Sequence, residues 1–219
     1  MNWTDEGYLL SKTSYNENSI IIEAFTINHG KCSGIVYGGL SRKNKSNFQI
    51  ANKIFLNWKS KGDNRLGYFT VELIKPIAPF YFDDKKRLAC ILSAASILKI
   101  LLPERQINKT IYNSFEKILN DLTHKEWIKL YINWEITLIK DLGFEINYNK
   151  SINKDIFIEI NDKKFKVPKI LMYEKFQKIY KTDVKEALMF NRNLLIENFI
   201  LPNGLKIPLF RKILENYYS

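Results

Sequence analysis

The feature that most constrains the fold is the strict alternation of side chains over residues 53–61. Ile54, Leu56 and Trp58 fall on one side of an extended chain, and mainly polar residues fall on the other. Because successive side chains of a strand point to opposite faces of a sheet, this segment is expected to pack one face against a core. Residues 66–75 alternate in the same way and predict a second such strand. In that strand the expected inward residues are Phe69, Val71 and Leu73, and the expected outward residues are Tyr68, Thr70 and Glu72.

Three more strand candidates precede this pair along the chain. They cover residues 7–12, 19–26 and 31–38, and turn signals at 15–18 and 28–31 separate them. Five short strands joined by tight turns fit a small closed barrel, which hides its edges and presents one face with its loops. An OB-fold is the first expectation, and an SH3-like barrel is the alternative.

Beyond Pro76 and Pro79 the hydrophobic period changes to about 3.6 residues, which predicts helices. The expected helices cover about 84–102, 108–120, 125–142, 184–201 and 208–217. In the third of them Trp127, Tyr131 and Trp134 share one face and are expected to lie in a core. The second half of the chain is therefore expected to be mainly helical.

The predicted fold class is α+β, with two domains. Residues 1–79 would form a five-stranded OB-fold barrel for nucleic-acid binding, and residues 80–219 would form an all-helical domain. A small β-hairpin is expected around Asn161 and Asp162, inside an insertion over about 152–168.

The chain carries a formal net charge of +11 at pH 7, from 34 Lys and Arg residues against 23 Asp and Glu residues. Such a basic excess favours a polyanionic partner. A coding bias toward Lys, Ile and Asn would also raise the charge, so the total alone leaves the partner open. The hydrophobic fraction of 46% argues against a disordered chain.

The basic residues cluster around a loop that two glycines open, from Gly38 to Asn47. Between Lys31 and Arg65 there are eight Lys or Arg residues and one acid, Asp63. We predict that this loop and the following strand bind a nucleic-acid backbone, since each neutralised phosphate releases counterions. An ordinary solvated loop is the alternative. The candidate nucleic-acid-binding residues are Arg42, Lys43, Lys45, Lys53, Phe55, Lys59, Lys61, Arg65 and Tyr68.

Two of these candidates, Phe55 and Tyr68, are aromatic and fall among lysines on the outward side of their strands. There they would stack on bases without regard to sequence. For Phe55, packing beneath the helical domain is the alternative. Trp58 alternates with apolar residues and is assigned to the core.

No motif for catalysis, for a cofactor or for a metal ion is present. Cys32 and Cys90 form no CxxC pair, and His29 and His124 have no neighbours at ligand spacing. A phosphate-binding glycine loop, a nucleophile elbow and an HExxH motif are also missing. We therefore expect a protein that is not an enzyme and uses no cofactor. The absence of an apolar leader and of a membrane-spanning run predicts a soluble, cytoplasmic protein with no membrane partner.

Several motifs, taken in order along the chain, resemble the RecO family of DNA repair proteins, the bacterial recombination mediators. The matching segments are residues 5–11, 26–31, 38–43, 101–105 and 134–144, followed by Arg211 near the end. The resemblance covers nearly the whole chain and implies an N-terminal OB-fold and a C-terminal helical domain. Many relatives carry four zinc-binding cysteines after the Leu-Gly-Phe motif. Residues 145–168 contain no cysteine, so the hairpin is interpreted as a metal-free replacement.

The resemblance also implies a function. It implies binding to single- and double-stranded DNA and annealing of complementary strands. It implies partnership with RecR and with the acidic tail of single-stranded DNA-binding protein, so that RecA is loaded, indirectly, onto coated gaps. Such a protein would be cytoplasmic and associated with the nucleoid when it acts.

Other readings of the residues stay open. An RNA-binding OB-fold protein of translation or RNA processing would prefer structured RNA to single-stranded DNA. A basic protein-interaction scaffold would keep its nucleic-acid affinity when Arg42, Lys43 and Lys45 are reversed in charge. A second basic region would extend a DNA track, line a groove for an acidic, apolar-ended peptide, or form a solvated face. Its lysines are Lys163, Lys164, Lys166, Lys169, Lys175, Lys178, Lys181 and Lys185.

Overall fold

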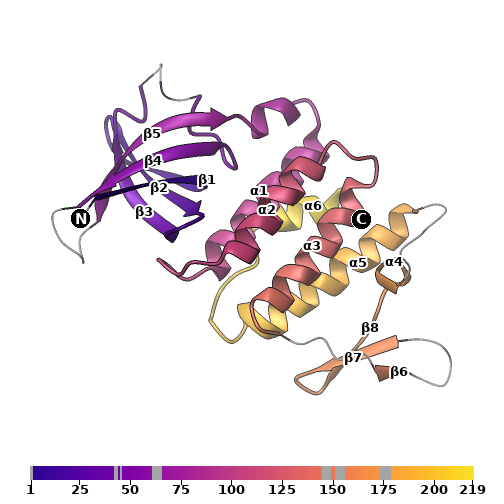
Figure 1. The fold of residues 1–219 in the computed structure, drawn as a ribbon. Coiled ribbons are helices and arrows are strands. Elements are labelled where there is room, and N and C mark those ends of the chain that lie inside the picture. The colour runs from indigo at the N-terminus through magenta and orange to yellow at the C-terminus, as the bar shows by residue number, and fades with distance from the viewer. Residues whose placement is uncertain are drawn as a thin grey trace. The chain divides into compact units, whose positions relative to one another are not determined.

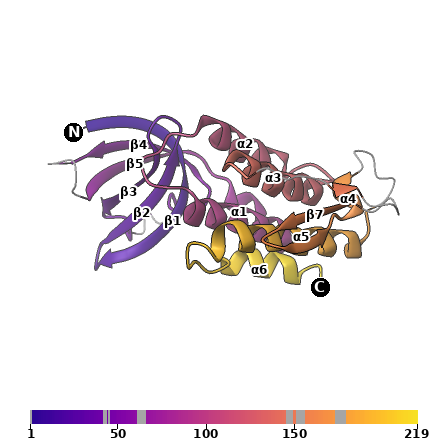
Figure 2. The ribbon, with the colours of Figure 1, turned by 90° about the horizontal axis from the view of Figure 1, so that it is seen from below.

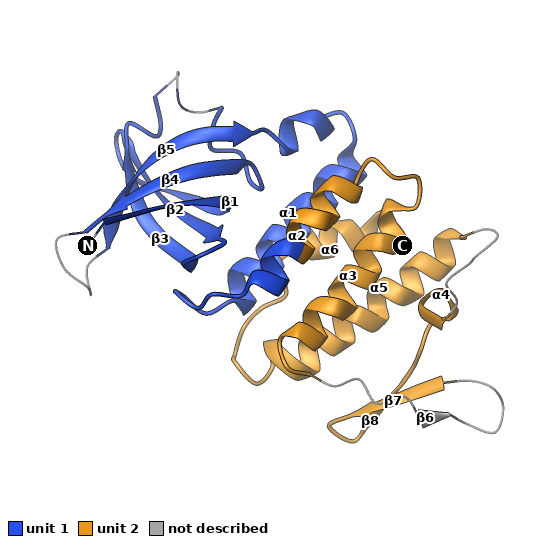
Figure 3. Ribbon diagram, viewed as in Figure 1, with its two compact units in different colours: residues 1–113 blue, residues 114–219 orange. Residues whose placement is uncertain are grey.

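The computed structural model describes residues 2–41, 44, 46–60, 66–144, 149–150, 156–172 and 179–219. Strands dominate the first third of the chain and helices the remainder, as Figure 1 shows. The chain divides into two units, residues 1–113 and residues 114–219, which Figure 3 colours separately. We refer to them as unit 1 and unit 2.

Unit 1 contains a closed barrel with the strand order β1-β2-β3-β5-β4, in which β4 pairs back with β1. Its strands are β1 (Asn2–Asn16), β2 (Ser19–Thr26), β3 (Gly30–Tyr37), β4 (Lys53–Lys59) and β5 (Gly67–Lys75). Adjacent strands run antiparallel except for β3 and β5, which run parallel. Figure 2 shows the strands wrapped around one interior. This five-stranded closed sheet confirms the predicted OB-fold barrel.

The barrel core follows from the alternation in the sequence. Ile54, Leu56 and Trp58 are buried and pack with residues of the other strands. Strand β5 departs from the prediction, because Leu73 was expected inward and is 36% exposed. The pairing of β4 with β5 shifts register between Lys53 and Ile54, so regular alternation ends at this edge of the barrel.

Strand β1 begins earlier and ends later than the segment 7–12 that the pattern predicted. Asp5 breaks the apolar pattern, yet the side chain is buried because its carboxylate accepts hydrogen bonds from the β2–β3 turn. A hydrophobic pattern cannot predict that a carboxylate is buried when its hydrogen-bond partners lie far away in sequence.

Helices follow the barrel in unit 1: η1 (Ala78–Tyr81), α1 (Lys85–Leu101) and the beginning of α2 (Lys109–Asp121). Asp84 caps α1, because its Oδ1 accepts the backbone N–H of Arg87 at 3.0 Å. Helix α1 is tied to the barrel through Lys99. Its Nζ lies 2.9 Å from Glu23 Oε2, and its carbonyl oxygen accepts a 2.7 Å hydrogen bond from Lys31 Nζ.

Unit 2 contains the rest of α2 and further helices, together with a small sheet. The helices are α3 (Trp127–Asp141), α4 (Lys169–Met172), α5 (Lys181–Leu195), η2 (Ile196–Ile200) and α6 (Leu209–Asn216). The predicted core stripe Trp127, Tyr131 and Trp134 is buried. The segment predicted as one helix over 184–201 is α5 followed by the π-turn of η2, where Leu201 N–H reaches the carbonyl of Ile196 at 2.9 Å.

The small sheet of unit 2 has the order β6-β7-β8. Its strands are β6 (Asn149–Lys150), β7 (Ile156–Ile160) and β8 (Lys163–Lys166). The predicted hairpin is confirmed, and Asn161 and Asp162 form its turn with positive φ angles of 49° and 62°. The third strand, β6, was not expected, because two residues are too few to show a period.

The predicted division into domains of residues 1–79 and 80–219 stays a prediction. Unit 1 continues to residue 113 because α1 is bonded to the barrel. Within the described ranges, no helix is both long enough and apolar enough to cross a membrane.

Candidate nucleic-acid interface

The structure describes four of the nine candidate residues. Lys53, Phe55 and Lys59 lie on the outward side of β4, and Tyr68 lies on the outward side of β5. The remaining five, Arg42, Lys43, Lys45, Lys61 and Arg65, lie outside the described residues.

The two ends of the outward β4 face differ in charge. At one end Lys53 Nζ lies 3.3 Å from Glu6 Oε2 and 5.9 Å from the centre of the Tyr8 ring. Phe55, which is 36% exposed, has Glu6 as its register partner on β1 and Glu72 on β5. Carboxylates on both sides of the ring disfavour a phosphate chain at this end.

At the other end the surroundings are suited to a nucleic-acid strand. Lys59 is exposed and pairs in register with Tyr68. The Tyr68 ring lies 6.2 Å from the ring of Tyr37, a tilted pair, and their exposed fractions are 39% and 66%. Tyr37, Lys59 and Tyr68 form what we call the tyrosine cluster.

Sequence reasoning missed Tyr37. The signal was present, because Tyr37 shares the outward register of β3 with Ser33 and Ile35. It also directly precedes Gly38, where the basic loop begins. The charges of the loop alone do not point to this aromatic ring, which belongs to the preceding strand.

The loop between β3 and β4 is anchored at both ends. Gly38 has a φ of +69°, a left-handed backbone that glycine adopts without strain, and its carbonyl accepts the Asn44 side-chain amide at 3.2 Å. At the far end Phe48 is buried, and the N–H of Ala51 donates to the carbonyl of Leu9 at 2.7 Å. The loop that carries the predicted phosphate contacts therefore leaves the barrel directly beside Tyr37.

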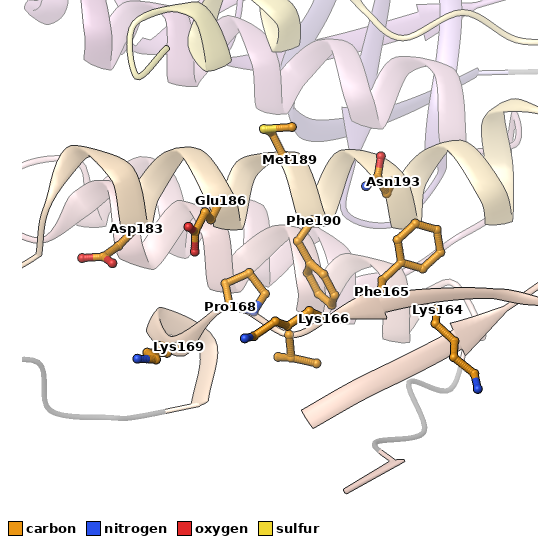
Figure 4. A pocket seen from close by; sticks show the side chains of 11 residues that line it. Lys164, Phe165, Lys166, Pro168, Lys169, Asp183, Glu186, Met189, Phe190 and Asn193 are labelled. Carbon is orange, nitrogen blue, oxygen red and sulfur yellow. The ribbon is translucent and has the colours of Figure 1, made fainter. Parts of the chain in front are cut away.

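A second candidate surface is a groove of about 610 Å³ in unit 2, between β8 with the segment after it and α5. Figure 4 shows Phe165 and Phe190 projecting into the space between these elements. One wall carries Lys164, Lys166 and Lys169, and α5 contributes an exposed Met189. We call this surface the β8–α5 groove.

Not all of the predicted lysines belong to this groove. Lys163 Nζ lies 2.6 Å from Glu197 Oε1, and Lys181 Nζ donates to the Ser219 carbonyl at 2.8 Å. Lys175 and Lys178 lie outside the described residues. The groove also has an acidic end, where Asp183 and Glu186 project from α5 on the side of Lys169 (Figure 4).

The described residues hold no group of three or more His, Cys, Asp and Glu side chains arranged for a metal ion. Burial raises the pKa of the Cys32 thiol to about 12, so the sulfur is protonated and a poor nucleophile or ligand at neutral pH. Cys90 is also buried and free.

Two family models match this chain, one in the barrel and one in the helical part that follows it. Residues 1–77 match the family model described as recombination protein O N terminal, and residues 83–155 match recombination protein O C terminal. The DNA repair protein RecO of Dinoroseobacter shibae is 32% identical over 161 residues, which is 71% of this chain and 67% of that protein. The chain belongs to the RecO family. The resemblance read from the motifs is thereby confirmed.

Other RecO proteins match to a similar degree. The DNA repair protein RecO of Cereibacter sphaeroides is 35% identical over 150 residues, covering 68% of this chain and 62% of the relative. That of Roseobacter denitrificans is 34% identical over 147 residues, covering 67% and 61%. The chain thus spans about three fifths of the length of these relatives.

Of the two candidate surfaces, one lies inside the residues matched by the RecO family models and the other lies beyond them. The N-terminal match contains all five barrel strands and so includes the tyrosine cluster. The C-terminal match ends at residue 155, before β8 and α5. The β8–α5 groove is therefore a feature of this chain that the family match does not cover.

Proposed function

We propose that this RecO-family protein is a recombination mediator that binds single- and double-stranded DNA and anneals complementary strands. In this role it helps to load RecA onto gaps coated by single-stranded DNA-binding protein, with RecR as a partner. It does so without making or breaking covalent bonds, in the cytoplasm and at the nucleoid. The tyrosine cluster beside the basic loop is the observation that carries the proposal.

The chemistry of the cluster suits a strand of any sequence. Every base has a π face, and stacking on an aromatic side chain contributes about 1–3 kcal/mol per base. Tyr37 and Tyr68 offer two such rings at one place, and Lys59, the register partner of Tyr68, supplies a cation for a phosphate of the same strand. Single-stranded gaps in DNA arise at any base sequence. A mediator therefore needs a contact that tolerates every base rather than hydrogen bonds that read the edges of particular bases.

Annealing needs two strands close together, and their phosphates repel each other. The chain has a net charge of +11, and basic residues are dense between Lys31 and Arg65. Neutralising phosphates with Lys and Arg lowers this repulsion and releases counterions. A protein that holds strands by charge and stacking leaves the base edges free to pair.

Fluorescence anisotropy with labelled oligothymidylate tests the role of the cluster. The double substitution Tyr37→Ala and Tyr68→Ala is expected to weaken binding about tenfold or more, since it removes two stacking surfaces. Phe80→Ala is the matched control, because Phe80 is 74% exposed in the same unit and belongs to neither candidate surface. Tyr68→Phe keeps the ring and should bind as the wild type does.

The proposed DNA contact fails if the double variant binds as tightly as Phe80→Ala. A structured RNA competitor is added in the same assay. Displacement by that RNA at lower concentration than by single-stranded DNA would favour an RNA-binding protein instead.

We further propose that the β8–α5 groove receives the acidic tail of single-stranded DNA-binding protein. Lys164 and Lys166 attract carboxylates, and Phe165, Met189 and Phe190 offer apolar contact to the end of such a peptide. Asp183 and Glu186 repel carboxylates, so the acidic residues would lie toward Lys164, away from the Lys169 end.

A fluorescent peptide with acidic residues and an apolar carboxyl end tests this assignment. The variant Lys164→Glu with Lys166→Glu is expected to weaken peptide binding about tenfold or more, because attraction becomes repulsion. Lys125→Glu, an exposed lysine outside the groove, is the control. Loss of DNA binding with unchanged peptide binding would instead make these lysines part of the DNA track.

A further inference from the structure

Unit 1 contains a cavity of about 440 Å³ at the end of the barrel where β1 begins and β4 ends. Its walls include Trp3, His29, Cys32, Trp58, Arg105 and Ile107. Small-molecule sites commonly have volumes of about 300–1,000 Å³, aromatic walls and a few polar groups. The cavity therefore has the size and lining of a binding site, and among the described residues its walls include none of the basic loop and none of the tyrosine cluster.

Three rings are stacked along one side of the cavity. The ring of Trp3 lies parallel to that of His29, with centroids 4.0 Å apart and an angle of 9°. The Trp3 ring also stacks on the ring of Trp58, with centroids 5.5 Å apart and an angle of 15° between the planes. Rings at this spacing are in contact with one another, so a further flat ring would stack on the face that the column turns to the cavity, which we call the slot.

The surrounding structure holds these rings in place. The buried Asp5 carboxylate accepts His29 Nδ1 at 2.8 Å and also two donors of Asn28, at 2.8 and 3.0 Å. Trp58 lies directly on Gly67, where a Cβ would come within 2.4 Å of the indole. The slot is therefore rigid, and little conformational entropy is lost when a ligand enters.

A cation completes the cavity. The guanidinium of Arg105 lies 5.9 Å from the centre of the Trp58 ring. Arg105 has a φ of +59°, which is uncommon for a residue with a side chain, and its N–H is held by the carbonyl of Lys31 at 2.8 Å. Such sparsely populated backbone conformations concentrate at ligand sites, where the surrounding structure maintains them.

We propose that this cavity binds one unstacked nucleobase of a single DNA strand, with Arg105 pairing with a phosphate of that nucleotide or its neighbour. A base is flat and partly polar, and it matches a slot of stacked rings with a fixed cation. This inference rests on the proposed function, since it takes the strand as given. It adds to the tyrosine cluster a second contact, which holds one base turned out of the strand.

The cavity is placed to receive a base from a strand on the tyrosine cluster. Asn2 lines the cavity and is the register partner of Lys59. Trp58, in the cavity wall, precedes Lys59 on β4. A strand that stacks on Tyr68 and passes Lys59 therefore reaches the rim within about one or two nucleotides, at an extended spacing of several ångströms each. Turning one base out of such a strand supplies the occupant.

Photo-crosslinking with an oligothymidylate that carries 5-iododeoxyuridine tests the proposal, because the modified base couples to aromatic side chains that it contacts. Peptide mapping by mass spectrometry then identifies the residue. We expect adducts at Trp3, His29 or Trp58 in addition to adducts at Tyr37 or Tyr68. The variant Arg105→Gln should lower the cavity adducts about tenfold and leave the tyrosine adducts unchanged.

Two variants control the experiment. Arg87→Gln removes an arginine of the same unit that is paired with Asp84 outside the cavity, and it should leave every adduct unchanged. Trp3→Leu shortens the ring stack and should remove the cavity adducts even if some stability is lost, which thermal unfolding monitors. Adducts at the tyrosines alone would overturn the cavity proposal and leave the proposed function standing. Strand binding without any adduct in the barrel would overturn both.

Discussion

Asp5 in unit 1 and Glu135 in unit 2 are both buried carboxylates, and their surroundings differ in a way that separates function from structure. Asp5 is paired with a histidine whose side chain is 34% exposed. Glu135 is paired with Arg211, and both side chains are fully buried. One carboxylate lies behind a histidine that lines a cavity, and the other lies in a closed core.

The Asp5 carboxylate has its partners on the β2–β3 turn and on the adjacent Glu6. Burial acts to raise its pKa, but hydrogen bonds from His29, from Asn28 and from the backbone of Glu6 outweigh burial and lower the pKa. Its histidine partner stacks on Trp3 and faces the cavity. The carboxylate thus orients a ring that is still accessible to a ligand.

The Glu135 carboxylate has partners from three helices. Arg211 Nε donates to it at 2.6 Å, Tyr131 Oη at 2.6 Å and Asn191 Nδ2 at 3.0 Å. Burial would lower the pKa of Arg211, but Glu135 more than offsets this effect and raises the pKa, so the guanidinium stays charged. All of these groups face one another, and their role is to fix how α3, α5 and α6 pack.

In this protein, a buried carboxylate with an exposed partner lies beside a candidate site, and one with a buried partner lies in the packed helices. The network of Glu135 and Arg211 specifies the helical packing, and a change there should alter stability alone. The pair of Asp5 and His29 should affect stability and, through the cavity, DNA contact.

Arg211→Met should have the largest effect. It leaves the Glu135 carboxylate buried without its cation, and the expected cost is about 3–5 kcal/mol of the free energy of unfolding. Urea denaturation monitored by tryptophan fluorescence measures the change. Adding Glu135→Leu to this variant should recover part of the loss, because no unpaired charge then remains. If the single and double variants are equally stable, the network does not work as a charge pair.

Asp5→Asn should cost less, about 1–3 kcal/mol at pH 7, because four donors lose a charged acceptor. The pKa of Asp5 is lower in the folded chain than its ordinary value of 3.8. Its contribution is therefore complete above that value and is lost as pH falls through the folded-state pKa. The difference in unfolding free energy between wild type and variant should shrink below about pH 4. A difference that stays constant down to pH 3 would contradict this assignment.

Arg192→Met should have the smallest effect. Arg192 Nη1 lies 2.9 Å from Glu215 Oε1, but its side chain is 41% exposed. Solvent screens such a pair, and the expected cost is at most about 1 kcal/mol. Comparison with Arg211→Met, measured in the same denaturation assay, shows how strongly exposure decides the value of an ion pair in this unit. Equal losses for the two arginines would remove that distinction.

Much of the barrel could be predicted, because its strands alternate clearly. The pattern of Ile54, Leu56 and Trp58 depends only on residues next to one another in the chain. That the strands close into a small barrel followed from their number and short length. Helix α1 could also be placed, since Asp84 caps it and Pro103 follows it.

The site could be predicted only in part, because its contacts join distant residues. Tyr37 and Tyr68 meet through the parallel pairing of β3 with β5, which no local pattern shows. The cavity depends on Arg105, whose segment comes after α1 and is held against β3 by a backbone hydrogen bond. The charge of Lys53 suggested a phosphate contact, but its nearest carboxylate, Glu6, lies on another strand.

The central claim is that the basic loop and the neighbouring tyrosines bind a DNA strand. Anisotropy of labelled single-stranded DNA across a salt series tests it most directly, comparing the wild type with the variant Arg42→Glu, Lys43→Glu, Lys45→Glu after both are shown to fold. The account predicts at least about tenfold weaker binding for the variant and a salt slope lower by up to about 2, since each phosphate contact on a single strand contributes about 0.7. Equal affinity and equal slope would contradict the claim, and the function would then have to rest on protein partners.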